Sequence, residues 1–185
     1  MAIAEAVSQQ GLTTWNVDAA HTHVAFAVRH LMITTVKGRF DAVSGTVRSS
    51  DAQPAKGDVD ITINAASIDT REPQRDAHLR SADFLDVEKF PTITFKSRRI
   101  TDVKGGNFTL AGDLTIHGVT REVVLDVTSE GRAKDPWGGE RAGFTAATKI
   151  NRSDFGLTWN QALETGGVLV GDEVKISLDI ELLKQ

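Results

Sequence analysis

The chain of 185 residues contains no cysteine, which excludes disulfide bonds, thiolate metal sites and cysteine nucleophiles together. It also contains no tyrosine, three tryptophans and four prolines. No apolar run approaches the ~20 residues that a membrane helix requires, so the chain is not expected to span a membrane as a helix. The remaining composition is near the globular average, with 40% apolar and 25% charged residues, and predicts a folded protein.

Charges of the two signs are nearly balanced, since 21 Lys and Arg stand against 25 Asp and Glu for a formal net charge of -4. The basic residues are scattered, so the basic patch of a nucleic-acid-binding protein is missing and no nucleic-acid partner is expected. The first fifteen residues contain no Lys or Arg, and Glu5 interrupts their apolar stretch. No signal peptide is recognisable, which predicts a cytoplasmic protein, or a periplasmic or secreted one if a signal peptide has been removed.

Most of the sequence alternates apolar and polar residues with the period of two that is typical of half-buried strands. In the clearest run, residues 174–182, Val, Ile and Leu alternate with Lys, Ser, Asp and Glu. Residues 118–120 are expected to form the turn of a hairpin. Eight strands are predicted, over residues 24–28, 36–47, 59–63, 93–95, 108–116, 123–127, 144–150 and 174–182.

Two stretches do not follow the strand pattern. Residues 73–89 contain no Gly and no internal Pro, and their apolar residues recur at helical spacing, which predicts one or two short helical turns. Residues 153–165 are expected to begin with a short turn that Ser153 caps. Because no repeat or linker is visible, we expect a flexible N-terminal segment over residues 1–12 and a single domain over residues 13–185.

Several predicted strands are long, at about twelve residues against the 5 to 6 of a typical strand, and long strands favour a closed barrel. The polar faces carry full charges such as Lys175, Asp179 and Glu181, so the apolar faces point inward rather than toward lipid. The predicted fold class is all-β, an eight-stranded antiparallel barrel with one or two short helical segments. Such a barrel is just wide enough to be filled by side chains or to hold one small ligand.

The interior of this barrel is therefore either a packed core or an apolar cavity. Gly45, Gly112 and Ala146 lie on the inward faces, and their small size favours unfilled space. A filled barrel would instead be a scaffold that docks a protein partner on its outer face or on residues 73–89.

The five histidines are the first candidates for catalysis. His21 and His23 lie on one face of an extended segment and could hold a metal ion for hydrolysis or isomerisation, given a third ligand. Ordinary hydrogen bonding at strand ends explains these histidines more simply, and the charged segment around His78 makes that residue a surface histidine. We therefore predict no enzyme, no catalytic residue and no resident metal. The candidates for a third ligand are His30, His78, His117, Asp18 and Asp76.

Residues 151–156, with the sequence Asn-Arg-Ser-Asp-Phe-Gly, form the most structured polar motif. Arg152 and Asp154 could pair across it. The motif is either a corner locked by hydrogen bonds or a polar rim where Arg152 anchors the anionic head group of a ligand. A hydrolase nucleophile is not indicated, because no Gly-x-Ser-x-Gly elbow is present.

Eight segments of the chain match a known family pattern: residues 15–18, 21–22, 26–30, 36–40, 67–70, 75–91, 112–120 and 152–156. Together they resemble the YceI-like family of polyisoprenoid-binding proteins, over nearly the whole chain from Trp15 to Leu183. The resemblance implies a lipocalin-like antiparallel barrel that binds one amphiphilic lipid, and it implies no established enzyme activity. Many members of the family are periplasmic, from which this sequence departs because it shows no signal peptide.

The leading hypothesis is the binding, storage or transport of an amphiphilic lipid, either a polyisoprenoid, an isoprenoid quinone or a fatty-acid derivative. His30, Arg152 and Asp154 are the candidates for contact with its head group, and Phe84, Leu85 and Phe90 for closing one mouth. No cofactor other than the lipid is expected, and a homodimer would be unsurprising for this family. The predicted tail contacts are Phe26, Val28, Phe40, Ile61, Ile63, Phe84, Phe95, Phe108, Leu110, Leu114, Ile116, Leu125, Phe144, Trp159, Ile176 and Leu178.

Overall fold

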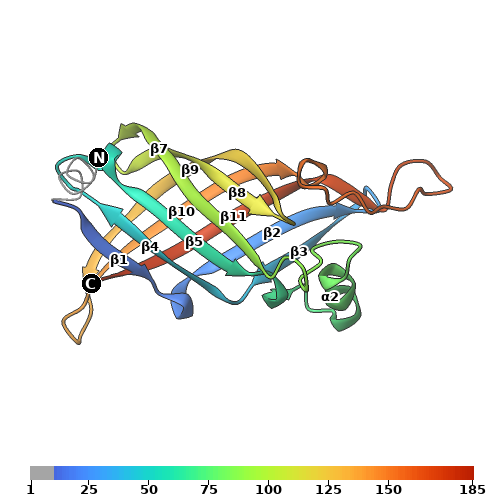
Figure 1. The fold of residues 1–185 in the computed structure, drawn as a ribbon, viewed down its shortest axis with the longest axis horizontal. Helices are drawn as coiled ribbons and strands as arrows, with labels where there is room; N and C mark the ends of the chain where they lie inside the picture. Colours follow the sequence, from blue (N-terminus) through green and yellow to red (C-terminus); the bar gives the residue numbers. More distant parts are fainter. Residues whose placement is uncertain (1–10) are drawn as a thin grey trace.

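The computed structural model describes residues 11–185, which form one closed antiparallel β-barrel with a short helix beside it (Figure 1). Alternating β-branched and polar residues produce the strands, as the period of two predicts. The strands are β1 (Thr13–Val17), β2 (His23–His30), β3 (Thr34–Phe40), β4 (Val43–Ser49), β5 (Asp58–Asn64), β6 (Ile68–Asp69), β7 (Thr92–Lys104), β8 (Asn107–Ile116), β9 (Val119–Lys134), β10 (Glu140–Asn151) and β11 (Val170–Lys184). The helices are α2 (Pro73–Arg80) and the 3-10 turns η1 (Ala19–His21), η2 (Pro54–Lys56), η3 (Ala65–Ser67) and η4 (Arg152–Phe155).

The barrel closes because β1 pairs with both β4 and β11. The other pairings run from β4 through β5, β7, β8, β9 and β10 to β11, all antiparallel. Three of the barrel strands are interrupted and each consists of two elements. β1 and β2 form one such strand along β11, β3 and β4 form the next, and β5 and β6 form the third. Counting each interrupted strand once, the barrel has eight strands, which confirms the predicted fold class.

Two of the strand predictions need correction. The sequence predicts one strand over residues 36–47, but residues 41–42 separate β3 from β4, because β3 pairs with β2 and β6 whereas β4 pairs with β1 and β5. Strand β1 was not predicted from the sequence, and the structure adds it at the start of the barrel.

The turn between β8 and β9 lies one residue earlier than predicted. Ile116 pairs with Val119, so the turn consists of His117 and Gly118, and Thr120 belongs to β9. Both turn residues have positive φ, 54° and 71°, as a two-residue hairpin turn of type I′ requires. Glycine is common at the second position of such a turn, and that preference would have placed it correctly.

Helix α2 is shorter than the predicted segment 73–89. Glu72 caps its N-terminus by accepting hydrogen bonds from the backbone N–H groups of Gln74 and Arg75, and Pro73 occupies its first turn, where a missing N–H costs nothing. Beyond Arg80 the chain continues in turns. No helix within residues 11–185 is long and apolar enough to cross a membrane.

Candidate functional site

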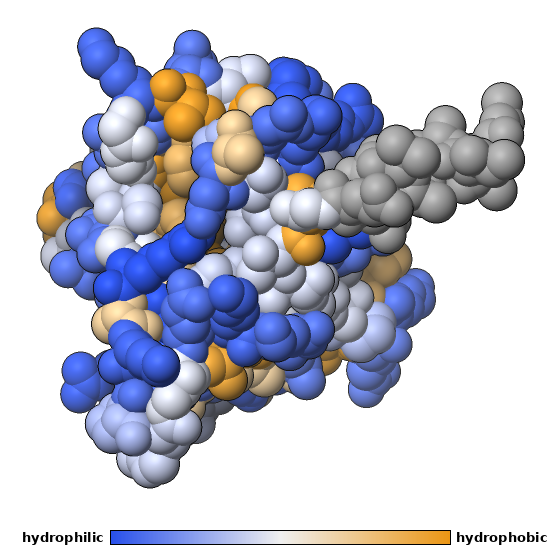
Figure 2. All heavy atoms as spheres, turned by 90° about the vertical axis from the view of Figure 1, so that its left-hand side faces the viewer, coloured by the Kyte–Doolittle hydropathy of each residue, from blue (hydrophilic) through white to orange (hydrophobic). Residues whose placement is uncertain are grey.

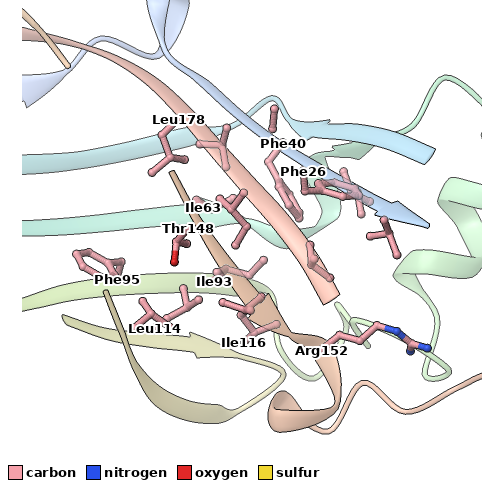
Figure 3. Close-up of a pocket in the computed structure, with 18 of the residues that line it drawn as sticks. Phe26, Phe40, Ile63, Ile93, Phe95, Leu114, Ile116, Thr148, Arg152 and Leu178 are labelled. Carbon is pink, nitrogen blue, oxygen red and sulfur yellow. The ribbon is translucent and has the colours of Figure 1, made fainter. Parts of the chain in front are cut away.

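The barrel encloses a cavity of about 420 Å³ (Figure 3). Aromatic and aliphatic side chains from every strand of the barrel line it, since alternate residues of each strand point inward. All sixteen residues predicted as tail contacts lie on this wall, from Phe26 on β2 to Leu178 on β11. The interior is therefore an apolar cavity and not a filled core.

Many further wall residues were not predicted as contacts, and valines are the largest group among them. Most of these valines lie on the inward faces of strands that the sequence does predict, so including every inward residue of those strands would have found them. The missed valines are Val17, Val24, Val36, Val43, Val47, Val59, Val123, Val127, Val170 and Val174.

The interpretation that Gly45 and Gly112 leave space in the barrel is wrong, whereas Ala146 does line the cavity. A methyl group at Gly112 would lie 2.5 Å from the ring of Phe95, and one at Gly45 would lie 2.8 Å from the side chain of Ile61. These glycines let a neighbouring strand's side chain lie over the backbone, so their space is already filled.

Replacing Gly112 by alanine is therefore expected to lower the free energy of unfolding by about 1–3 kcal/mol, because the Phe95 ring and the carbonyl oxygen of Lys96, 2.6 Å from the new methyl group, must both move. Urea denaturation measures this change. The matched control is Gly143→Ala on β10, where a methyl group would meet its nearest neighbour at 3.6 Å. Equal stability of the two variants would contradict the packing of Phe95 over Gly112.

One end of the barrel is closed by Trp15. This residue is 2% exposed and shares the inward face of β1 with Val17, but the cavity wall includes Val17 and not Trp15. The indole packs against Ala142 and Leu182 and donates a hydrogen bond from Nε1 to Ser49 Oγ at 3.0 Å. Figure 2 views this end, whose coloured surface is mainly hydrophilic.

The opposite end, beside α2, is polar and open. Arg29 and Arg75 line the cavity and are also exposed to solvent, so the cavity reaches the surface there. His30, Thr70 and His78 lie on the same part of the wall. We call this end of the barrel the mouth.

His78 is not a plain surface residue, contrary to the sequence interpretation. Its ring lies edge-on to Phe84 and Trp159, with centroid distances of 5.0 and 4.7 Å, and its Nε2 is 2.8 Å from Asp83 Oδ2. Phe84 is buried and lines the cavity, as predicted for a tail contact, and Leu85 beside it in the sequence is likewise buried on the wall. Phe90 is not part of this group, because it packs against the ring of His117 outside the wall.

Thr70 connects α2 to the mouth. Its hydroxyl and its backbone N–H both donate to Oδ1 of the buried Asp76. Arg75 donates from Nε to Thr70 Oγ1 and from Nη2 to the Thr70 carbonyl, both at 2.7 Å. Asp76 therefore ties α2 to the backbone of Thr70 and does not serve as the third metal ligand that the sequence left open.

Arg152 holds the loop at the mouth in place. Its guanidinium donates to four carbonyl oxygens, those of Leu157, Trp159, Val170 and Gly171, at 2.7, 2.9, 3.3 and 2.8 Å. One of its five N–H groups is left for any ligand. Burial of the guanidinium lowers the pKa of Arg152 from its ordinary value, and its side chain forms part of the cavity wall (Figure 3).

Two predictions about the 152–156 motif are wrong. Asp154 does not pair with Arg152, which prefers carbonyl groups of the following loop, and Asp154 is exposed and lies outside the cavity wall. Ser153 does not cap η4 with its side chain. Its hydroxyl and its backbone N–H instead donate to the carboxylate of Asp172.

His21 and His23 do not converge on one site. His21 Nδ1 lies 2.8 Å from Asp18 Oδ2 and 3.9 Å from Glu181 Oε1, and the hydrogen bond to Asp18 raises the pKa of His21. Arg141 donates to both carboxylates, at 2.6 and 2.7 Å. Because this guanidinium already neutralises the acidic groups, the cluster is an ion-pair network at the closed end, and it does not resemble the expected two-histidine metal site.

A family model described as a YceI-like domain matches residues 15–182. A UPF0312 protein of Staphylococcus aureus is 38% identical over 175 residues, which are 92% of this chain and 97% of the relative. A UPF0312 protein of Vibrio cholerae is 40% identical over 138 residues, 75% of this chain and 73% of the relative.

Solved structures show the same fold. Burkholderia cenocepacia BcnA superimposes with a TM-score of 0.78 at 26% identity, over 89% of this chain and 98% of BcnA. The YCEI protein of Campylobacter jejuni has a TM-score of 0.72 at 32% identity, over 85% and 90% of the two chains. A polyisoprenoid-binding domain from Saccharophagus degradans has a TM-score of 0.70 at 14% identity, over 94% and 99%, and shares the fold.

Proposed function

The chain belongs to the YceI-like family, and from this premise we propose that its barrel binds an amphiphilic lipid whose tail lies in the cavity. The observation that carries the proposal is the asymmetry of the barrel. A wall of apolar side chains is sealed at one end by Trp15 and opens at the other end beside two arginines and two histidines. An amphiphile fits this arrangement tail first.

The energetics favour a ligand with a long tail. Each buried methylene contributes ~0.8 kcal/mol, so ten of them contribute about 8 kcal/mol before entropic costs. Micromolar affinity corresponds to a net free energy of about 8 kcal/mol, so the tail must bury more than ten methylenes to offset those costs. We propose a polyisoprenoid, an isoprenoid quinone or a fatty-acid derivative, and the Saccharophagus degradans domain of the same fold, which is described as polyisoprenoid-binding, supports the first of these.

The head group is proposed to lie at the mouth, near His30 and the one unused N–H group of Arg152. Arg29 and Arg75, which the sequence pattern does not single out, are further candidates because both line the cavity. Their positive charges would attract an anionic or strongly polarised head group. In this role the protein stores or carries the lipid and performs no reaction on it.

Native mass spectrometry of the freshly purified protein, followed by organic extraction, tests the proposal. We expect a bound amphiphile of defined mass at one per chain. Protein that is recovered empty is then titrated with fluorescent farnesyl and palmitoyl derivatives, for which we expect micromolar affinity. Empty protein that takes up neither probe would refute lipid binding in the barrel.

A further inference from the structure

The turn that joins β2 to β3 carries three consecutive apolar residues in solvent. Leu31, Met32 and Ile33 are 37%, 52% and 72% exposed. Val168, in the loop before β11, is 36% exposed, and Met32 lies against Gly167 of the same loop. We call these four apolar residues the tip.

The backbone of the tip is also unfavourable for the residues that occupy it. Leu31 and Met32 have positive φ values of 53° and 62°. Branched and bulky residues rarely adopt this left-handed conformation, which costs about 1–2 kcal/mol per residue and is normally taken by Gly, Asn or Asp. Polar residues in this turn would improve both the solubility and the stability of the protein. A contact between the turn and an apolar environment explains why apolar residues occupy it.

The tip stands directly beside the mouth of the cavity. The backbone N–H of Leu31 donates to the carbonyl oxygen of Leu169 at 2.9 Å, and both His30 and Leu169 line the cavity. In Figure 1 the β2–β3 turn, the loop before β11 and α2 all lie at the end of the barrel away from the C-terminus.

A cation lies at the base of the tip. Arg29 donates from Nη2 to the carbonyl oxygen of Met32 at 3.1 Å and from Nη1 to Thr35 Oγ1 at 3.3 Å. Its side chain is exposed, and no ion pair is formed with it among residues 11–185. At a bilayer surface the phosphate groups lie outside the acyl chains. Apolar side chains of the tip could therefore contact the acyl chains while Arg29 at its base lies at the level of the phosphates.

We propose that the tip inserts into the surface of a lipid bilayer and places the mouth where an amphiphile can leave or enter the membrane. This inference rests on the proposed function, because it supplies the donor and acceptor of the lipid. A stable contact with a protein buries about 800 Å² and 20–30 residues per partner, far more than four side chains provide. Reversible binding to a bilayer needs few buried apolar residues.

The test is flotation with vesicles of phosphatidylcholine and phosphatidylglycerol at a ratio of about three to one, at ~0.15 M salt. The variant is Leu31→Asn, Met32→Gly and Ile33→Ser combined. We expect its vesicle partition coefficient to fall at least about tenfold. Its melting temperature should rise by about 2–4 °C, because Asn and Gly suit the positive φ values.

The matched control is Trp137→Ser, which removes an apolar side chain that is 87% exposed at the closed end and should leave vesicle binding unchanged. Binding of the soluble farnesyl probe without vesicles is measured in parallel and separates the two proposals. Wild-type protein that binds the probe but not vesicles overturns the membrane contact alone. Undiminished vesicle binding by the triple variant also overturns it. The same holds if the wild-type protein is a dimer that does not bind vesicles and the triple variant is a monomer.

Discussion

Replacing Ala146 by phenylalanine is expected to weaken binding of the farnesyl and palmitoyl probes at least about a hundredfold. Ala146 lies on β10 between Val127 of β9 and Leu178 of β11, and its side chain points into the cavity. A phenyl ring there displaces three to four methylenes of the tail, at ~0.8 kcal/mol each, which amounts to about 3 kcal/mol and hence the hundredfold loss. Fluorescence titration measures the change.

The neighbouring residue provides the matched control for this substitution. Ala147 is exposed because successive side chains of a strand point to opposite faces. Ala147→Phe should therefore leave probe affinity within about twofold of wild type, and both variants should unfold as cooperatively as the parent. If Ala146→Phe binds the probes normally, the tail does not lie in the barrel.

Replacing Arg152 by leucine is expected to lower the free energy of unfolding by about 3–5 kcal/mol. The guanidinium is buried and satisfies four carbonyl groups of the chain between Leu157 and Gly171. Leucine leaves those carbonyls without their donors, although it preserves much of the apolar stem. Urea denaturation gives the free energy, and faster hydrogen exchange in residues 157–171 should accompany the loss.

Two further variants show whether the planar arrangement of the guanidinium N–H groups is needed for this stability. Arg152→Lys should recover part of the stability at most, because one ammonium group cannot reproduce the geometry of Nε, Nη1 and Nη2. Arg98→Leu removes an arginine that is paired with Asp113 and Glu122 at the surface, and it should change stability by no more than about 1 kcal/mol. If Arg152→Leu were as mild as Arg98→Leu, the carbonyl contacts would not stabilise the mouth.

The predictable part of the candidate site is its apolar wall. Phe26, Leu114 and Ile176 come from three different strands, yet each could be assigned to the interior from its own neighbours in the sequence. The polar mouth was predicted only in part. His30 and Arg152 were selected and do line the cavity, Asp154 was selected and does not, and Arg29, Arg75 and Thr70 were missed.

Local order in the sequence thus determines the strands, their inward faces and the eight-stranded antiparallel class, because side chains alternate along a strand whatever the strand pairs with. The packing contacts between elements depend instead on residues that are distant in the sequence. Phe95 of β7 covers Gly112 of the neighbouring strand β8, Trp15 packs against Leu182 near the opposite terminus, and Arg152 donates to carbonyl groups of a loop that has no sequence period. Whether the inward face encloses a cavity, and which end of it is open, was decided by these contacts and hence by the tertiary structure alone.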